Sequence, residues 1–252
     1  MPHILIIDSN TAEINSASSK CAGAVYADAL MACQDDLIIT IAAPYDGDDT
    51  PELSGVDGVV FTGSGVEWNT DDPRAEPLAK VMRAVFAKGI PTLGSCNGMQ
   101  LAASVLGGCS SASPNGHEDG LAREIRLTDA GHKHPFMRGR RDGYAVPCVH
   151  RDEVRKLPDG AILLAGNAHS HVQAFVYEMN GIRFWGVQYH PEYTPEFISG
   201  LMARIGRMPE PQISDLGCAD VDVDAASRLG IRPEDMGAEV RLTELRNWLA
   251  SL

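Results

Sequence analysis

Short apolar runs alternate along this chain with longer segments in which apolar residues recur every three or four positions. The runs are rich in β-branched residues and have the length of strands buried on both faces. In the first half of the chain they occupy residues 3–8, 37–42, 56–62 and 90–94. The segments with helical spacing occupy residues 20–33, 73–88 and 99–106. Strands that alternate with helices predict an α/β fold with a mostly parallel sheet and helices on both of its faces.

The second half of the chain is less regular. Residues 110–158 are rich in Gly, His and Pro, and most of this stretch has neither a helical nor a strand pattern. Strands are expected at residues 123–128, 161–165, 172–177 and 184–188, and a helix at 195–205. The Met-Pro-Glu-Pro sequence after Arg207 is typical of a linker, and two modest helical segments follow it. We therefore expect a single domain over residues 1–207 and a short C-terminal helical extension over 208–252 that packs on it.

Composition narrows the classes of function. The chain has 34 acidic residues against 21 Lys and Arg, a formal charge of −13. This balance argues against nucleic acid as a partner, because affinity for the phosphate backbone depends on clustered cations. No apolar run approaches the roughly 20 residues that cross a bilayer, and no basic region precedes the first apolar run. Six cysteines without a C-x-x-C pair are typical of free thiols in a reducing compartment, so a cytoplasmic protein without a membrane partner is predicted.

One cysteine has neighbours that suggest chemistry. Cys96 is the centre of Gly-Ser-Cys-Asn-Gly, between an expected strand and an expected helix. This is the cysteine form of the Gly-x-Ser-x-Gly nucleophile elbow, in which a sharp turn exposes the central residue at the carboxyl edge of a sheet. The flanking glycines, Gly94 and Gly98, are expected because a Cβ there would collide with the neighbouring backbone. The helix N-terminus favours the thiolate, and the amide of Asn97 is directed towards an oxyanion beside the sulfur.

A thiol nucleophile needs a base, and the base needs a group that fixes its orientation. His190 directly follows an expected buried strand and is followed by Pro191 and Glu192. Because strand carboxyl ends line the crevice of an α/β sheet, His190 is expected beside Cys96. Glu192 can fold back across the rigid proline and orient the imidazole.

The other histidines carry a weaker signal. His169 and His171 alternate around Ser170, but the sequence near them has no Cys or acidic ligand pattern. Hydrogen-bonded or solvated histidines are therefore favoured there, and no metal site is predicted.

The two motifs together resemble the class I, triad-type glutamine amidotransferases. The resemblance rests on Gly94-Ser-Cys-Asn-Gly-Met-Gln100 and Gly186-Val-Gln-Tyr-His-Pro-Glu192, and it extends over about the first 200 residues. It implies a flavodoxin-like sheet and a triad in which Cys96 is the nucleophile, His190 the base and then the acid, and Glu192 the orienting carboxylate. The implied reaction passes through a γ-glutamyl thioester, releases ammonia and needs no cofactor.

The resemblance also implies residues that bind the substrate. Gln100 matches a family glutamine that helps to bind it, and the segment around His150 resembles the one that holds its α-amino acid end. The loop Phe61-Thr-Gly-Ser-Gly65 occupies the position of the family's oxyanion loop, where Gly63 or Ser64 would join Asn97. The loop lacks the proline that many members have, which leaves its donor amide open.

Three functions are compatible with these residues. The first is a glutaminase that delivers ammonia to a separate synthetase subunit, since no synthetase domain follows in this sequence. The second is a stand-alone γ-glutamyl hydrolase or peptidase, and the third is a non-catalytic binding or regulatory subunit. An intact Cys96, His190 and Glu192 argue against the third. An open pocket for a leaving group, shaped by Trp68 and the 67–72 loop, would favour the second over the first.

Overall fold

The fold is built on one mixed sheet of nine strands. The computed structural model describes residues 1–18, 20–48 and 51–252. The order across the sheet is β2-β1-β3-β4-β11-β10-β9-β6-β7, and β5 pairs with β8 in a separate two-stranded sheet. The strands are β1 (His3–Ile7), β2 (Ile38–Ala42), β3 (Gly58–Phe61), β4 (Thr92–Ser95), β5 (Cys109–Ala112), β6 (Glu118–Leu127), β7 (Tyr144–His150), β8 (Asp152–Lys156), β9 (Ile162–Gly166), β10 (Ala174–Tyr177) and β11 (Phe184–Val187).

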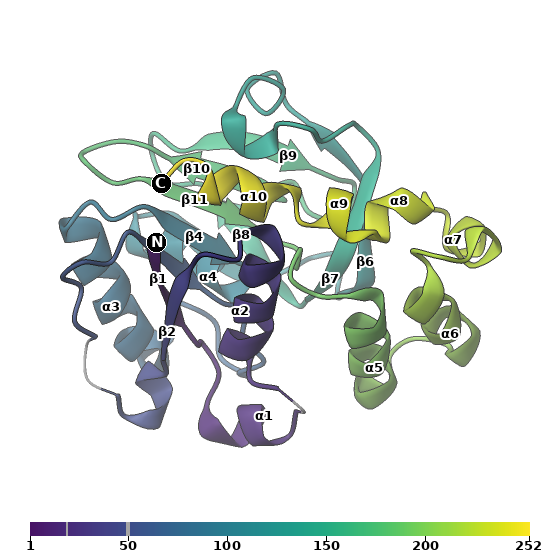
Figure 1. Ribbon diagram of the computed structural model, residues 1–252, viewed down its shortest axis with the longest axis horizontal. Coiled ribbons are helices and arrows are strands. Elements are labelled where there is room, and N and C mark those ends of the chain that lie inside the picture. Colours follow the sequence, from purple (N-terminus) through teal and green to yellow (C-terminus); the bar gives the residue numbers. More distant parts are fainter. Residues whose placement is uncertain (19, 49–50) are drawn as a thin grey trace.

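The parallel part of the sheet is the flavodoxin-like half that the alternating pattern predicts. Strands β2, β1, β3, β4 and β11 run parallel, and the antiparallel strands extend the sheet from β11. Helices α2 (Ala22–Cys33) and α10 (Thr243–Leu249) contribute to the core on one face, and α3 (Glu76–Ala87) and α4 (Asn97–Val105) to the core on the other. Figure 1 shows these two helical layers. The fold class predicted from the sequence is therefore confirmed.

Parallel strands place the chemistry at one edge. Strands β1, β3, β4 and β11 are neighbours that run in the same direction, so their carboxyl ends open on the same side of the sheet. Gly63 lies in the loop after β3, Cys96 directly follows β4, and His190 lies in the turn after β11. These are the three segments that the sequence assigned to the reaction centre.

The stretch 110–158 is more regular than its sequence suggests. It contains β5, β6, β7 and β8, of which the sequence indicated only the end of β6. The alternation in β6 is interrupted because Gly120 and Glu124 adopt positive φ angles of 81° and 53° and the register shifts between Ala122 and Ile125. In β7, Pro147 lacks an N–H but its carbonyl accepts a hydrogen bond from the His190 amide, at 2.8 Å.

The C-terminal extension differs from the expectation of a linker and two helices. Pro211 lies in the first turn of α6, where a proline is tolerated, so the Pro-rich segment begins a helix. Five short helices follow α5 (Pro195–Ile205): α6 (Glu210–Cys218), α7 (Val223–Leu229), α8 (Pro233–Met236), α9 (Ala238–Arg241) and α10. Gly230 and Gly237 separate several of them. The remaining helical segments in the described residues are the short helix α1 (Ala12–Ser16) and the 3₁₀ turns Pro44–Asp46, Pro73–Ala75 and Pro135–Met137.

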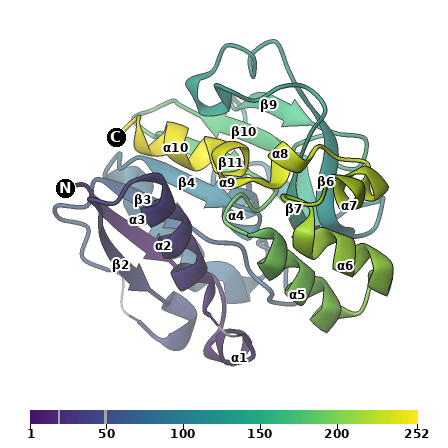
Figure 2. The same cartoon turned by 45° about the vertical axis from the view of Figure 1, so that its right-hand side comes forward.

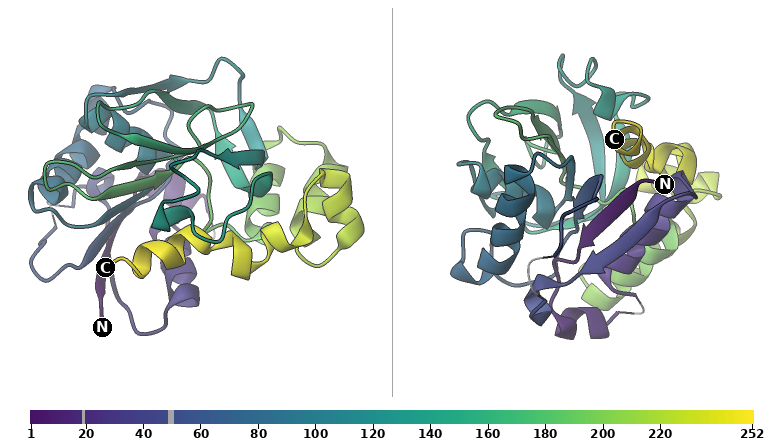
Figure 3. Two further views of the ribbon diagram at one scale, coloured as in Figure 1. Left: turned by 90° about the horizontal axis from the view of Figure 1, so that it is seen from above. Right: turned by 60° about the vertical axis from the view of Figure 1, so that its left-hand side comes forward.

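The C-terminal helices pack on the sheet. Figure 2 shows α8, α9 and α10 lying across the sheet, and Figure 3 shows the chain ending close to its own N-terminus. Trp248 of α10 is 1% exposed, and a Cβ on Gly58 of β3 would lie only 2.8 Å from its ring. The glycine therefore makes room for the aromatic ring of the extension. Among the described residues, no helix is long and apolar enough to cross a membrane.

Candidate active site

Cys96 lies on a strained turn between β4 and α4. Its backbone has φ 48° and ψ −105°, a conformation that a residue with a side chain rarely adopts. A Cβ on Gly94 would lie 2.7–2.8 Å from the backbone of Gly98 and Met99, and a Cβ on Gly98 would overlap the carbonyl oxygen of Phe61. Both flanking glycines are thus required by close backbone contacts, as the elbow motif predicts. The first amides of α4 have no partner within the helix and are free to bind an anion beside the sulfur.

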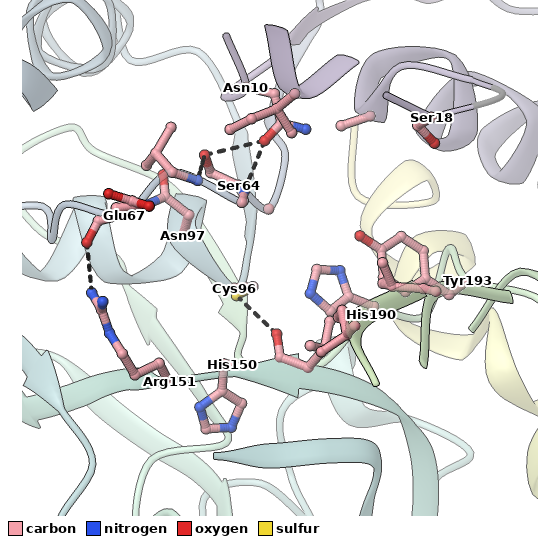
Figure 4. Close-up of a pocket in the computed structure, with 18 of the residues that line it drawn as sticks. Asn10, Ser18, Ser64, Glu67, Cys96, Asn97, His150, Arg151, His190 and Tyr193 are labelled. Atoms are coloured by element: carbon pink, nitrogen blue, oxygen red, sulfur yellow. Dashed lines mark hydrogen bonds between the residues drawn. The ribbon is translucent and has the colours of Figure 1, made fainter. Parts of the chain in front are cut away.

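His190 and Glu192 form a buried pair beside this elbow. The Nδ1–H of His190 donates to Oε1 of Glu192 at 2.6 Å, and both side chains are 2% exposed. The ring of Tyr193 stacks on the imidazole with 4.2 Å between ring centres and parallel planes. These contacts leave Nε2 as the ring nitrogen that faces the elbow (Figure 4).

The protonation of His190 depends on opposing effects. Burial disfavours the imidazolium, but the negative charge of Glu192 and hydrogen bonds to Cys96 and Glu192 outweigh burial and raise the pKa of His190 to about 10. The histidine therefore carries a proton at neutral pH. An imidazolium beside a cysteine is the setting in which a thiolate nucleophile is stabilised.

This pKa predicts how stability depends on pH. A group whose pKa is raised in the folded state stabilises it fully below its unfolded pKa, about 6.5, and loses that contribution as the pH rises towards 10. We expect the unfolding free energy of the wild type to fall between pH 6.5 and pH 10 by on the order of a few kcal/mol more than that of His190→Asn. Urea denaturation of both proteins across this range measures the difference. Parallel curves for the two proteins would contradict the raised pKa.

The loop after β3 faces the same turn. A Cβ on Gly63 would overlap the imidazole of His190, so the backbone of this loop comes as close to the histidine as only glycine permits. Ser64 donates through Oγ to the carbonyl of Ser9 at 2.6 Å, and the Gly65 amide donates to the Asn10 side chain at 2.8 Å. The loop is thereby fixed to the end of β1.

A cavity of about 490 Å³ opens over these groups. Every residue that the sequence assigned to substrate binding lines it: Gly63, Ser64, Asn97, Gln100 and His150. Gln100 is 4% exposed, and its Nε2 donates to the carbonyl of Asp152 at 2.7 Å. Cys96 Sγ lies 3.9 Å from the carbonyl oxygen of Val149, next to His150. Figure 4 shows Cys96 in the middle of this wall, with Asn97 and Ser64 to one side and His190 to the other.

His150 belongs to a second buried histidine–carboxylate pair. Its Nε2–H donates to Oε2 of Glu118 at 2.9 Å, and His169 lies 3.8 Å from the same oxygen. Among the described residues, this is the group whose spacing suits a metal ion. However, Glu118 also accepts bonds from Asn167 and Gln173 at 2.7 and 2.8 Å. The Glu118 carboxylate therefore already accepts hydrogen bonds from His150, Asn167 and Gln173, which accounts for its position without a metal ion.

Several residues around the centre were not found from the sequence. Tyr193 directly follows the His-Pro-Glu motif, so its proximity to His190 could have been predicted from the sequence. Glu118 and Arg241 come from distant segments, and no local sequence pattern indicates that they lie near the site. Arg151 holds the wall of the cavity, because its guanidinium donates to the carbonyl of Glu67 at 3.1 Å and to the side chain of Asp152 at 2.7 Å.

Comparison with known proteins agrees with this architecture. A γ-glutamyl-L-1-hydroxyisopropylamide hydrolase of Pseudomonas sp is 36% identical over 205 residues, which are 75% of this chain and 67% of that protein. A glutamine-hydrolysing GMP synthase of Symbiobacterium thermophilum is 38% identical over 141 residues, 55% of this chain and 25% of the synthase. The chain thus spans only about a quarter of the synthase.

The fold is shared along the whole chain with a solved structure. A glutamine amidotransferase from Methylobacillus flagellatus superposes with a TM-score of 0.72 at 20% identity, covering 100% of this chain and 95% of that one. The family model for class I glutamine amidotransferases matches residues 29–199, which include the elbow and the His-Pro-Glu turn. The chain therefore belongs to the class I glutamine amidotransferase family.

Proposed function

We propose that this protein hydrolyses a γ-glutamyl amide through a thioester on Cys96. The proposal rests on one observation: the strained elbow residue Cys96 and the buried His190–Glu192 pair lie at the same cavity. Cys96 is the nucleophile, His190 the acid and base, and Glu192 the group that orients the imidazole. The same three residues act in glutaminases and in γ-glutamyl hydrolases, so the leaving amine decides between them.

The first half of the reaction releases the amine. The thiolate of Cys96 attacks the carbonyl carbon of the γ-glutamyl amide and forms a tetrahedral oxyanion. The amide of Asn97, with that of Gly63 or Ser64, donates to the oxyanion. His190 gives its Nε2 proton to the leaving nitrogen, the C–N bond breaks, and the thioester remains.

The second half regenerates the enzyme. Neutral His190 now takes a proton from a water molecule that attacks the thioester carbonyl. Collapse of this second oxyanion breaks the C–S bond, releases glutamate and returns the thiolate beside the imidazolium. Glu192 stabilises the imidazolium in both halves without leaving its hydrogen bond at Nδ1.

The shape of the cavity favours an amine larger than ammonia. Beyond the elbow it is lined by apolar side chains, among them Ile14, Val66 and Phe197, and by Trp68. The Trp68 indole is fixed by a hydrogen bond to Tyr45 at 3.1 Å and by the Arg74 guanidinium, 4.7 Å from its ring centre. Ammonia has no apolar surface to bury there. We therefore favour a stand-alone γ-glutamyl hydrolase, the class to which the Pseudomonas relative belongs by name.

A glutaminase that serves a separate synthetase is the second candidate. It is favoured by the match to a glutamine-hydrolysing GMP synthase, of which the similar part is only 25%. In that case glutamine itself is the substrate, and the open cavity is closed by the synthetase subunit.

Glutamate release separates the candidates. The purified protein is incubated with glutamine and, separately, with γ-glutamyl alkylamides and γ-glutamyl dipeptides, with Cys96→Ala as the blank. We expect the alkylamides or dipeptides to be turned over well above glutamine. Slow turnover of glutamine alone would instead identify a subunit that waits for its synthetase. No Cys96-dependent release from any of them would contradict both and favour a binding protein.

His190→Asn tests the base. The variant keeps a polar side chain of similar width but lacks a group that transfers protons, so we expect kcat to fall by about 100-fold or more. His132→Asn, at an exposed histidine far from the cavity, is the matched control and should keep the wild-type rate. A normal rate in His190→Asn would show that the base lies elsewhere.

A further inference from the structure

The C-terminal extension sends a buried arginine to the catalytic turn. Arg241, the last residue of α9, is only 5% exposed. Its Nη1 donates to the carbonyl oxygen of Pro191, the residue between His190 and Glu192, and its Nε donates to the carbonyl of Met236 at 3.3 Å. An arginine is rarely buried unless its donors and charge are matched. The Pro191 carbonyl is therefore one of the groups that match the buried guanidinium.

Three successive residues at the start of the turn, Tyr189 to Pro191, are each held by a hydrogen bond with another part of the fold. Tyr189 donates through its hydroxyl to Glu244 of α10 at 2.7 Å. The amide of His190 donates to Pro147 of β7 at 2.8 Å. At Pro191 the partner is Arg241, so two of these three contacts come from the C-terminal extension.

Arg241 also supplies charge where Glu192 lacks a partner. Oε1 of Glu192 accepts from His190, while its buried Oε2 has no hydrogen-bond partner among the residues that the structure describes. Groups that interact electrostatically with Glu192 include His190 and Tyr193 on its own turn, Tyr26 on α2 and Arg241 on α9. Burial raises the pKa of both tyrosines, so they stay neutral. Arg241 is thus the fixed cation of this group, because a guanidinium does not lose its proton in a protein.

We propose that Arg241 is a positioning residue of the active site, which holds the Pro191 carbonyl and places a fixed positive charge near the His190–Glu192 pair. The extension then completes the catalytic turn. This inference rests on the proposed roles of Cys96, His190 and Glu192. Arg241 does not line the cavity, so it acts through the turn and has no direct contact with the substrate.

The test reads the state of Cys96 without a substrate. The rate at which iodoacetamide alkylates Cys96 is followed by mass spectrometry between pH 4 and 9, because only the thiolate reacts. In Arg241→Gln the amide keeps a donor for Pro191 but loses the charge. Loss of this positive charge weakens the electrostatic support of the His190–Glu192 pair beside Cys96, so we expect the acid limb of this profile to move up by about one pH unit.

Two further variants separate charge from structure. Arg241→Lys keeps the cation and should keep the wild-type acid limb. Arg246→Gln is the matched control, since Arg246 holds the same extension through the carbonyls of Ala238 and Glu239, at 2.8 and 2.6 Å, away from the turn. All variants are measured at low temperature with sucrose, which favours the folded state. The proposal would be overturned if the acid limb of the alkylation profile of Arg241→Gln lay at the wild-type pH. It would also be overturned if Arg246→Gln moved this limb as far as Arg241→Gln does.

Hydrolysis gives an independent readout. If the proposed function holds, Arg241→Gln should lower kcat by about tenfold or more and leave KM nearly unchanged, because the variant displaces the acid–base pair and not the substrate. A change in KM alone would overturn the positioning role. If no substrate is turned over by the wild type, the alkylation profile still decides on Arg241, so the two proposals fail separately.

Discussion

Replacing Cys96 with alanine is expected to lower amide hydrolysis by about 10⁴-fold or more, the largest effect of any single change in this chain. Removal of a nucleophile leaves only the binding and oxyanion contributions, which are small beside the covalent route. The elbow glycines and the backbone of Cys96 remain in place, so the fold should persist. Glutamate release from the best γ-glutamyl amide, measured against the wild type at equal protein concentration, gives the ratio.

Two other cysteines make this prediction specific. Cys109→Ala, on β5, and Cys148→Ala, on β7, should retain most of the wild-type activity. Cys148 is the stricter control, because it is fully buried, lies close enough to Cys96 for their charges to interact, and has a pKa raised by burial and by Glu118. It is therefore an unreactive thiol in the same region. An equal loss in either control would show that Cys96 is not the nucleophile.

The sequence predicted the parallel half of the fold well because its signals are local. An apolar strand such as 3–8 or 90–94 must be buried on both faces, and each is followed by a segment with helical spacing. The antiparallel half was harder to predict. Gly120 and Glu124 break the alternation of β6 with positive φ angles, and β8 is rich in charged residues. One of its acidic residues, Glu153, accepts a hydrogen bond at 2.6 Å from Ser170, a distant partner that no local pattern shows.

In the candidate site too, features set by local sequence could be predicted and contacts between distant segments could not. Cys96 and His190 each carry a short motif whose geometry follows from the local turn, and the order of the parallel strands brings the two turns together. The partners that support them come from remote segments. Glu118 reaches His150 across 32 positions, and Arg241 reaches Pro191 across 50. A single sequence contains no periodicity that links such positions, so the contact between the extension and the turn can be seen only in the structure.

Breaking the ion pair between Arg140 and Glu244 is expected to have the largest effect on stability. Both side chains are fully buried, with Nε and Nη2 of Arg140 donating to the two oxygens of Glu244 at 2.7 and 2.6 Å. The hydroxyl of Tyr189 donates to the same carboxylate at 2.7 Å. In Glu244→Leu the guanidinium stays buried without its counter-charge, which costs about 3–5 kcal/mol of unfolding free energy. Urea denaturation measures this loss.

The double variant Arg140→Met with Glu244→Leu shows whether the loss comes from the unpaired charge. Because a buried ion pair replaced by apolar side chains is often neutral, we expect the double variant to recover most of the stability. Glu239→Leu, at an exposed carboxylate 3.8 Å from Arg246, is the matched control and should leave the unfolding free energy nearly unchanged. If Glu244→Leu lost no more than this control, the extension would not be fastened by the pair. If it lost several kcal/mol and the double variant recovered them, α10 would be held to the segment before β7, which carries Arg140, by a charge that must be matched.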